Sequence, residues 1–341
     1  MFDLLLYVYL EYTHNKVYKN SVGIYSSRVF GEMENFVENN EVLVSVYCLV
    51  YNHEKYIRDC LDGFVKQKTN FKFEVIVHDD ASTDGTADII KEYAAKYPDI
   101  IKPILQKENQ YSKGASITLD IILPKCKGKY IAVCEGDDYW ICDTKLQQQS
   151  DIMEEHPEYI ACVHANKVIN YLNNTETINA RYEQSQVVNT VDVLSPMVPI
   201  FHTTSIFYRR KIIIERPAFF KETWDYAVLV YLALYGKIYY INEVMSVYRT
   251  LTPGSWTMRT RKKKDRKAEL GFPKYHVEFL RAADEYFGFK YHALIDKNIL
   301  NFEYQIWRVE PELKLLLNPR LYKLGCWRSV KMIFRCLFSF R

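Results

Sequence analysis

The sequence contains few glycines and prolines and no apolar run long enough to cross a bilayer. Only 12 of the 341 residues are Gly and 11 are Pro, whereas 48% are hydrophobic. This composition is typical of an ordered globular protein rather than of a low-complexity chain. The apolar start, residues 1–10, is much shorter than the roughly 20 residues of a membrane-spanning helix. We therefore expect no transmembrane segment, and one large domain with an appendage or two domains.

Cysteine pairs, a signal peptide and a strong net charge are also missing. None of the eight cysteines forms a C-x-x-C pair, so we expect neither a zinc site nor a disulfide framework, and a location in the reducing cytoplasm. The formal net charge of +3 is too small to indicate binding to nucleic acid. No G-x-G-x-x-G occurs, which argues against a dinucleotide-dependent dehydrogenase.

Two acidic clusters are the most informative feature that is present. Asp79 and Asp80 end one apolar run, and Glu135, Asp137 and Asp138 follow another. Short apolar runs of this kind predict strands of a parallel sheet, buried on both faces. Open parallel sheets bind ligands at the carboxyl ends of their strands, and a bound cation would offset the repulsion between clustered carboxylates. Carboxylates together with a hard cation favour a phosphate-bearing ligand, and hence a nucleotide.

Alternating strand and helix signals predict an α/β fold with right-handed crossovers. The expected strands are residues 42–49, 73–80, 130–134, 159–169 and 237–240. The expected helices are residues 52–65 with Asn52 as a cap, 87–97, 115–125, 145–156 and 227–235. Residues 170–200 are polar and show no clear pattern, the stretch 259–267 looks like a basic loop, and the remainder is expected to be helical.

Each acidic cluster also has a plainer interpretation. Asp79 and Asp80 fit a strand-to-helix turn, although two adjacent carboxylates after an apolar strand favour hydrogen bonding to a base or a ribose. Glu135 and Asp137 point to the same side of an extended segment, and Gly136 between them permits close approach of the backbone. Mg²⁺ and Mn²⁺ prefer one or two carboxylates together with phosphate oxygens. The alternative is a solvated acidic turn.

Together with residues 44–54, these clusters resemble the family 2 glycosyltransferases over residues 42–250, most of all bacterial members that build capsular, exopolysaccharide or lipopolysaccharide chains. The resemblance implies a GT-A fold, with a mostly parallel central sheet flanked by helices and a helical C-terminal appendage. It divides the chain into an N-terminal extension (1–41), a nucleotide-sugar half (42–140), an acceptor half (141–250) and a basic loop with a helical C-terminal region (251–341).

The resemblance also assigns roles in the nucleotide-sugar half. Tyr51 and Glu54 match residues that contact the base, and Asp80, with Asp79 beside it, matches an aspartate that binds base and ribose. Residues 135–137 stand where the family has D-x-D. This implies Asp137 as the better metal ligand, and Glu135 as the better contact for ribose or phosphate and a second ligand for Mn²⁺ or Mg²⁺. Two departures are Leu49 in place of a common proline and Glu135 in place of the first aspartate.

Residues 223–226 and 234–249 are similar to the acceptor-side segment of the family. Asp225 would lie at the start of a helix, where the dipole favours the charged form that a general base needs. A helix N-cap is the plainer role for Asp225, and Glu222 is the alternative base. Trp224 and His202 belong to the acceptor side by the same resemblance, although a lone His is more often structural.

The resulting expectation is an inverting glycosyltransferase that moves a sugar from a nucleotide-diphosphate sugar to a hydroxyl of a glycan or lipid-linked acceptor in surface polysaccharide synthesis. The Q-x-x-R-W motif of processive polymerases is missing, which favours one sugar per encounter. A nucleotidyltransferase is one rival, but it would carry a Gly-rich phosphate loop after the first strand. A catalytically degenerate sugar-nucleotide binder or scaffold is the other, and intact Asp80, Asp137 and Asp225 argue against it.

The C-terminal segment that we call the basic tail, residues 314–341, has seven basic and no acidic residues, interleaved with apolar and aromatic ones. Such helices lie on anionic membrane surfaces. A peripheral position at the inner face of the cytoplasmic membrane is therefore one expectation. Packing of the tail on the domain, with a solvated basic face, is the other.

Overall fold

The computed structural model describes residues 41–195, 199–253, 258 and 266–310. The expected extension 1–41, except for its last residue, and the basic tail lie outside the described residues, as does most of the expected basic loop. None of the helices within the described ranges is long and apolar enough to span a membrane.

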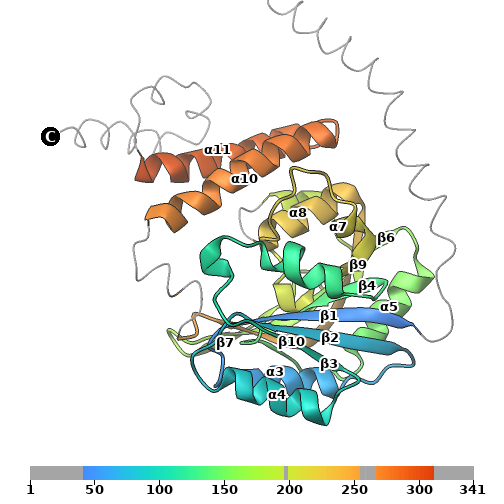
Figure 1. Cartoon of the computed structure of the whole chain (residues 1–341). Coiled ribbons are helices and arrows are strands. Elements are labelled where there is room, and N and C mark those ends of the chain that lie inside the picture. Colours follow the sequence, from blue (N-terminus) through green and yellow to red (C-terminus); the bar gives the residue numbers. More distant parts are fainter. Residues whose placement is uncertain (1–40, 196–198, 254–257, 259–265, 311–341) are drawn as a thin grey trace, which may run out of the picture.

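A single twisted sheet forms the centre of the molecule (Figure 1). Its strand order is β3-β2-β1-β4-β9-β6-β10-β5, with β7 on β6 and β8 on β10. The first four strands are parallel, as are β6 and β10, whereas β9 is antiparallel to both of its neighbours. The bounds are β1 Val42–Val50, β2 Lys72–Asp79, β3 Ile101–Leu105, β4 Tyr130–Val133, β5 Tyr139–Trp140, β6 Tyr159–Asn170, β7 Thr175–Asn179, β8 Gln186–Val187, β9 Phe207–Arg209 and β10 Lys237–Thr250.

Helices cover both faces of this sheet. Figure 1 shows α3 and α4 below the sheet, and α7, α8, α10 and α11 above it. The bounds are α3 Ile57–Val65, α4 Thr86–Lys96, α5 Lys145–Glu155, α6 Thr190–Leu194, α7 Arg210–Ile214, α8 Asp225–Tyr235, α10 Arg266–Tyr286 and α11 His292–Val309. A π-helical turn, Ile117–Ile122, precedes β4. The expected α/β architecture with a helical C-terminal region is therefore observed.

The alternation of side chains along β1 separates two hydrophobic cores. Val44, Val46 and Cys48 pack with residues of α3 and α4 in one core, whereas Tyr47 belongs to the core beneath α8, α10 and α11. Successive side chains of a strand point to opposite faces, so both sets are buried and the strand reads as continuously apolar. Helix α8 is buried over residues 226–233 because α10 and α11 cover its outer side.

Two expectations about the elements are wrong in detail, and one stretch for which the sequence gives no clear pattern contains further elements. Helix α3 begins at Ile57, because Asn52 adopts a left-handed backbone with φ 57° and its side chain accepts a hydrogen bond from the Thr83 N–H at 2.8 Å. The unpatterned stretch 170–200 contains β7, β8 and α6, whose strand residues are mostly exposed and thus carry little apolar signal. Strand β10 continues to Thr250, past a register shift between Ile241 and Val244.

The substitution Phe64→Ala should lower the free energy of unfolding by about 3–5 kcal/mol, the usual cost of a large buried aromatic. The Phe64 ring is fully buried and meets Trp140 edge-to-face, with centroids 4.8 Å apart. Urea denaturation measures this change. The control Leu172→Ala, at a side chain that is 68% exposed, should stay within about 0.5 kcal/mol of the parent. Equal effects of the two substitutions would contradict the packing described here.

Candidate functional site

The parallel register brings the ends of β1, β2 and β4 to one edge of the sheet. Val50 lies opposite Asp79 in the β1–β2 pair, and Tyr47 lies opposite Val133 in the β1–β4 pair. The backbone N–H of Gly136 donates to the Leu49 carbonyl at 2.9 Å. The loops that carry both acidic clusters therefore leave the sheet side by side, as the sequence predicts.

The two adjacent aspartates after β2 have different environments. Asp79 accepts hydrogen bonds from the hydroxyl and the N–H of Ser82, so its carboxylate stabilises the turn. Burial raises the pKa of Asp79, and the Ser82 hydrogen bonds oppose this shift. The oxygens of Asp80 accept the backbone N–H groups of Gln110 at 2.7 Å and Tyr111 at 3.1 Å. A carboxylate has about four acceptor positions, so Asp80 retains capacity for a ligand.

Tyr51 and Glu54 lie in the loop between β1 and α3. This loop is joined to the loop after β2: Asn52 N–H donates to Ser82 Oγ at 2.8 Å, and Glu54 N–H donates to Asp84 Oδ2 at 3.2 Å. The side chain of Tyr51 is partly buried and that of Glu54 is exposed. Both residues thus belong to a loop that is joined to the turn following Asp80 at the same edge of the sheet.

The second acidic cluster forms a compact loop. Oxygen atoms of Glu135, Asp137 and Asp138 lie within 4.8 Å of one another. A Cβ atom at Gly136 would lie 2.9 Å from Nδ1 of His53 and 2.9 Å from a methyl group of Val50. Glycine is needed there because the loop backbone packs directly on the end of β1.

Asp138 is a third carboxylate of this group, beyond the pair that the sequence analysis assigns to a metal. Its Oδ1 accepts the Arg249 N–H at 2.7 Å, whereas its buried Oδ2 has no hydrogen-bond partner among the described residues. Burial raises the pKa of Asp138 well above its usual range, and the charge of Asp137 adds to the shift. An unsatisfied buried oxygen beside two further carboxylates fits a divalent cation. The sequence signal was its position next to Asp137.

The end of β10 clamps the acidic loop, which the sequence analysis missed. Nη1 of Arg249 donates to the backbone carbonyl of Asp137 at 3.0 Å, and the guanidinium lies 4.3 Å from the Tyr139 ring centroid. Nη2 of Arg249 pairs with Asp59. The hydroxyl of Thr252 donates to Oδ2 of Asp137 at 3.0 Å. Arg249 is the last residue of the segment 234–249, which resembles the family. Nothing local in the sequence reveals its long-range partners.

Asp225 is the first residue of α8, and Trp224 is the N-cap, so the plainer role of Asp225 as the N-cap is wrong. The charge of Asp225 acts on the acidic loop: after burial, it is the next cause of the raised pKa of Glu135, and it also adds to the effect of burial on the pKa of Tyr47. Burial raises the pKa of Asp225 itself. The structure thus brings Asp225 and Glu135 together, and both remain partly exposed to solvent.

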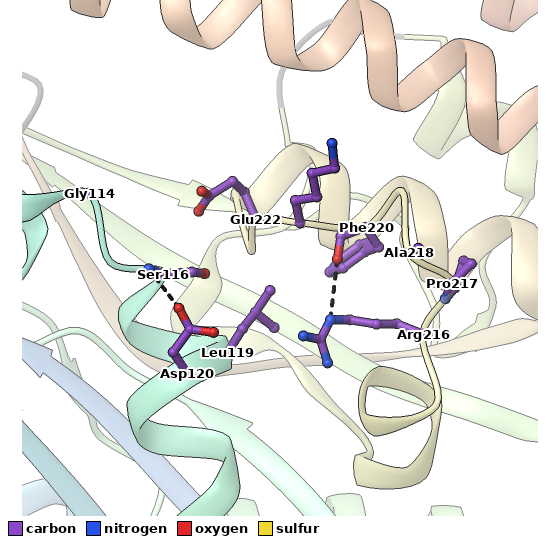
Figure 2. Close-up of a pocket in the computed structure, with 10 residues that line it drawn as sticks. Gly114, Ser116, Leu119, Asp120, Arg216, Pro217, Ala218, Phe220 and Glu222 are labelled. Carbon is purple, nitrogen blue, oxygen red and sulfur yellow. Dashed lines mark hydrogen bonds between the residues drawn. The ribbon is translucent and has the colours of Figure 1, made fainter.

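Glu222 has a different environment, although it lies only three residues before Asp225. Burial raises its pKa, the charge of Asp120 adds to this, and a hydrogen bond with the Ser116 side chain opposes it. Glu222 lines an open cleft with these two residues (Figure 2). Trp224 packs edge-to-face on Phe272 of α10 at 5.4 Å.

His202 lies deeper on the acceptor side. Its ring stacks on Tyr248, with centroids 4.0 Å apart, and its Nδ1 lies 3.1 Å from Oδ1 of Asn166. Burial lowers the pKa of His202 to about 4, so the ring is neutral at pH 7. After burial, the charges of Asp138 and Glu135 raise the pKa of Tyr248. His202 therefore contacts Tyr248, and Tyr248 is close enough to the acidic loop for the loop charges to act on its hydroxyl.

Comparison with known proteins places this geometry in a wider group. Residues 45–216, half of the chain, match the family model described as Glycosyl transferase family 2. The uncharacterized protein Rv1520 of Mycobacterium tuberculosis is 37% identical over 213 residues, which cover 62% of this chain and 60% of that protein. The Escherichia coli protein WfaP, named UDP-Glc:alpha-D-GlcNAc-diphosphoundecaprenol beta-1,3-glucosyltransferase, is 37% identical over 112 residues, 33% of this chain and 41% of that protein.

A solved structure shares the fold. The structure of S. aureus TarS 1–349 in complex with UDP-GlcNAc matches with a TM-score of 0.54 and 18% identity, covering 82% of this chain and 78% of that chain. This likeness confirms the expected GT-A architecture with its mixed α/β sheet. The chain spans about 60% of the length of the curated relatives that it matches over the longest alignment.

In excess chelator, Asp138→Asn should gain stability relative to the parent as the pH rises above about 4. The parent releases the Asp138 proton at a raised pKa when folded, but near pH 4 when unfolded. In this pH window the folded parent therefore binds more protons than the unfolded parent. Its free energy of unfolding falls by up to about 1.4 kcal/mol per pH unit as the pH rises. Chemical denaturation of both proteins from pH 5 to 8 measures the difference, in which the other titrating groups largely cancel. A difference independent of pH would contradict the raised pKa.

Proposed function

The chain belongs to glycosyl transferase family 2, and from this premise we propose that it moves a sugar from a nucleotide-diphosphate sugar to a hydroxyl of a glycan or lipid-linked acceptor. The observation that carries the proposal is the convergence of the Glu135, Asp137 and Asp138 carboxylates at the carboxyl edge of a parallel sheet, with Asp225 near enough for its charge to raise the pKa of Glu135 after burial. Residues 42–140 act as the nucleotide-sugar half and residues 141–250 as the acceptor half.

The donor binds along the ends of β1, β2 and β4. Asp80 and the Tyr51–Glu54 loop receive the base and ribose, because both lie at the same edge as the acidic loop. The name of WfaP includes a UDP-linked donor, and the TarS structure holds UDP-GlcNAc. A UDP sugar is therefore the first donor to test.

The acidic loop holds a divalent cation, Mn²⁺ or Mg²⁺. Asp137 and Glu135 are the proposed ligands, and the unsatisfied Oδ2 of Asp138 makes it a further one. Such a cation supplies Lewis-acid stabilisation of the negative charge that develops on a departing diphosphate. Arg249 and Thr252 fix the loop by hydrogen bonds to Asp137 and Asp138.

Asp225 acts as the general base. The acceptor oxygen forms a bond to the anomeric carbon while the bond from that carbon to the phosphate oxygen breaks, and the acceptor proton passes to the Asp225 carboxylate. One displacement of this kind inverts the anomeric centre. The raised pKa of Asp225 supports this role, because a base with a pKa nearer the working pH accepts a proton more readily. His202 and Trp224 shape the acceptor side.

The peripheral position at a cytoplasmic membrane surface stays part of the proposal. It depends on the basic tail, residues 314–341, which lies outside the described residues. A lipid-linked acceptor would present its sugar at such a surface.

UDP should bind more tightly with Mn²⁺ than with excess chelator, and Asp137→Asn should remove this difference. Without a cation, the acidic loop repels the diphosphate. Calorimetric titration of UDP with and without Mn²⁺ measures both affinities. Glu155→Gln, at an exposed carboxylate of α5, is the matched control and should behave like the parent. Equal affinity of the parent in Mn²⁺ and in chelator would remove the cation from the mechanism.

Asp225→Asn should retain UDP affinity and lose about 10²- to 10⁴-fold in kcat, the usual contribution of a general base. The rate at which UDP is released during transfer from a UDP sugar to an acceptor measures kcat. Glu222→Gln removes a carboxylate three residues away that does not face the acidic loop, and it should keep kcat within a few-fold of the parent. An active Asp225→Asn together with an inactive Glu222→Gln would assign the base to Glu222.

A further inference from the structure

An open cleft of about 500 Å³ lies between two segments that meet above the sheet (Figure 2). Ser116 and Asp120, from the stretch before β4, form one wall. Arg216, Lys221 and Glu222, from the stretch between α7 and α8, belong to the other. Figure 2 shows the Arg216 guanidinium extending toward Leu119, between the two walls.

We propose that this cleft binds a neutral, hydroxyl-rich sugar residue of the acceptor, with Asp120, Arg216 and Glu222 as its hydrogen-bonding side chains. This inference rests on the proposed glycosyl transfer and names the part of the acceptor that is recognised. It assigns Glu222 to acceptor binding rather than to proton transfer.

The charges of the cleft favour a neutral ligand. Two carboxylates, Asp120 and Glu222, stand against two cations, Arg216 and Lys221. A phosphate group would meet as much repulsion as attraction in such a site, because Coulomb terms of opposite sign offset each other. Sugar hydroxyls both donate and accept hydrogen bonds, so they match carboxylate acceptors and guanidinium donors together.

The polar groups of the cleft are fixed before a ligand arrives. Nε of Arg216 donates to the Phe220 carbonyl at 3.2 Å, and Nη1 donates to the Ile213 carbonyl at 3.2 Å. Oδ2 of Asp120 accepts the Ser116 N–H at 3.2 Å. Preorganised side chains bind with less loss of conformational entropy. The Arg216 guanidinium has five N–H donors, so further donors remain for a ligand.

Helix α10 holds Glu222 in place. The hydroxyl of Tyr275 accepts the Glu222 N–H at 3.2 Å and lies 3.0 Å from the Glu222 carbonyl, to which it donates. The Phe220 ring is buried and packs on Tyr231 at 4.8 Å, which anchors the same segment to α8. The cleft is therefore lined by residues of both halves, and Tyr275 of α10 supports one of its walls.

The cleft is close to the proposed base. Three residues of extended chain span at most about 11 Å, so the backbone of Glu222 lies within that distance of the backbone of Asp225. Because the Asp225 carboxylate points to the other side of the chain, the sugar in the cleft would position a linked residue of the acceptor, and that residue would present its hydroxyl to Asp225.

Saturation-transfer NMR on the full chain with UDP and Mn²⁺ tests the inference, with a panel of neutral methyl glycosides and inorganic phosphate as probes. At least one glycoside should receive saturation from the parent, and Asp120→Asn/Glu222→Gln should reduce the signal at least five-fold. Glu222→Gln alone serves if the double variant does not fold. Lys211→Gln, at an exposed cation of α7 outside the cleft, is the control and should leave the signal unchanged.

Two results would overturn the inference. One is that no glycoside signal depends on Asp120 or Glu222. The other is a phosphate signal, observed by ³¹P relaxation, that disappears in Arg216→Gln. UDP affinity, measured on the same samples, separates the two levels of the proposal. Intact nucleotide binding without glycoside binding rejects only the sugar cleft, whereas a parent that binds neither UDP nor any other nucleoside diphosphate rejects the proposed transfer as well.

Discussion

Mutual repulsion among three carboxylates in one four-residue loop is the constraint on which the site depends. Glu135, Asp137 and Asp138 approach one another within 4.8 Å, and the rest of the fold must offset the resulting Coulomb energy. The N–H and the guanidinium of Arg249 and the hydroxyl of Thr252 do so by hydrogen bonding to the loop. Burial first, and neighbouring negative charges after it, raise the pKa values of Glu135 and Asp138, so a bound cation would stabilise their charged forms.

Strand β10 connects this loop to the acceptor side. It pairs with β5 directly after the loop, Ser246 opposite Trp140, and runs parallel to β6 along its whole length. Two consecutive residues near its end have different tasks: Tyr248 stacks on His202, whereas Arg249 holds Asp137. Because neighbouring residues of a strand point to opposite faces, β10 binds the acidic loop through one residue and packs on His202 through the residue before it.

Local patterns in the sequence predict the parts of the fold that local chemistry determines. Apolar runs predict β1, β2, β4 and β6, and the parallel topology then brings Asp80 and Glu135 to one edge. Patterns fail where distant contacts decide. Asn52 is left-handed because its side chain bonds to Thr83, β7 is stabilised by pairing with β6 despite its polar residues, and Arg249 acquires its role only from partners more than one hundred residues away.

The separation of Glu222 from Asp225 follows from the same geometry. Residues 221–224 precede the helix, α8 begins at Asp225, and the Trp224 carbonyl accepts the first helical hydrogen bond from the Val228 N–H. In extended backbone, side chains three positions apart point to opposite sides, so one carboxylate meets Asp120 while the other meets Glu135. The resemblance to the acceptor-side segment and the expected helix start made Asp225 the candidate for the base, with Glu222 as the alternative. Their environments divide the tasks: the carboxylate whose charge acts on the acidic loop is suited to take a proton, and the carboxylate in the open cleft is suited to hold an acceptor. Changes in the cleft can then alter acceptor choice without altering the groups that perform the transfer.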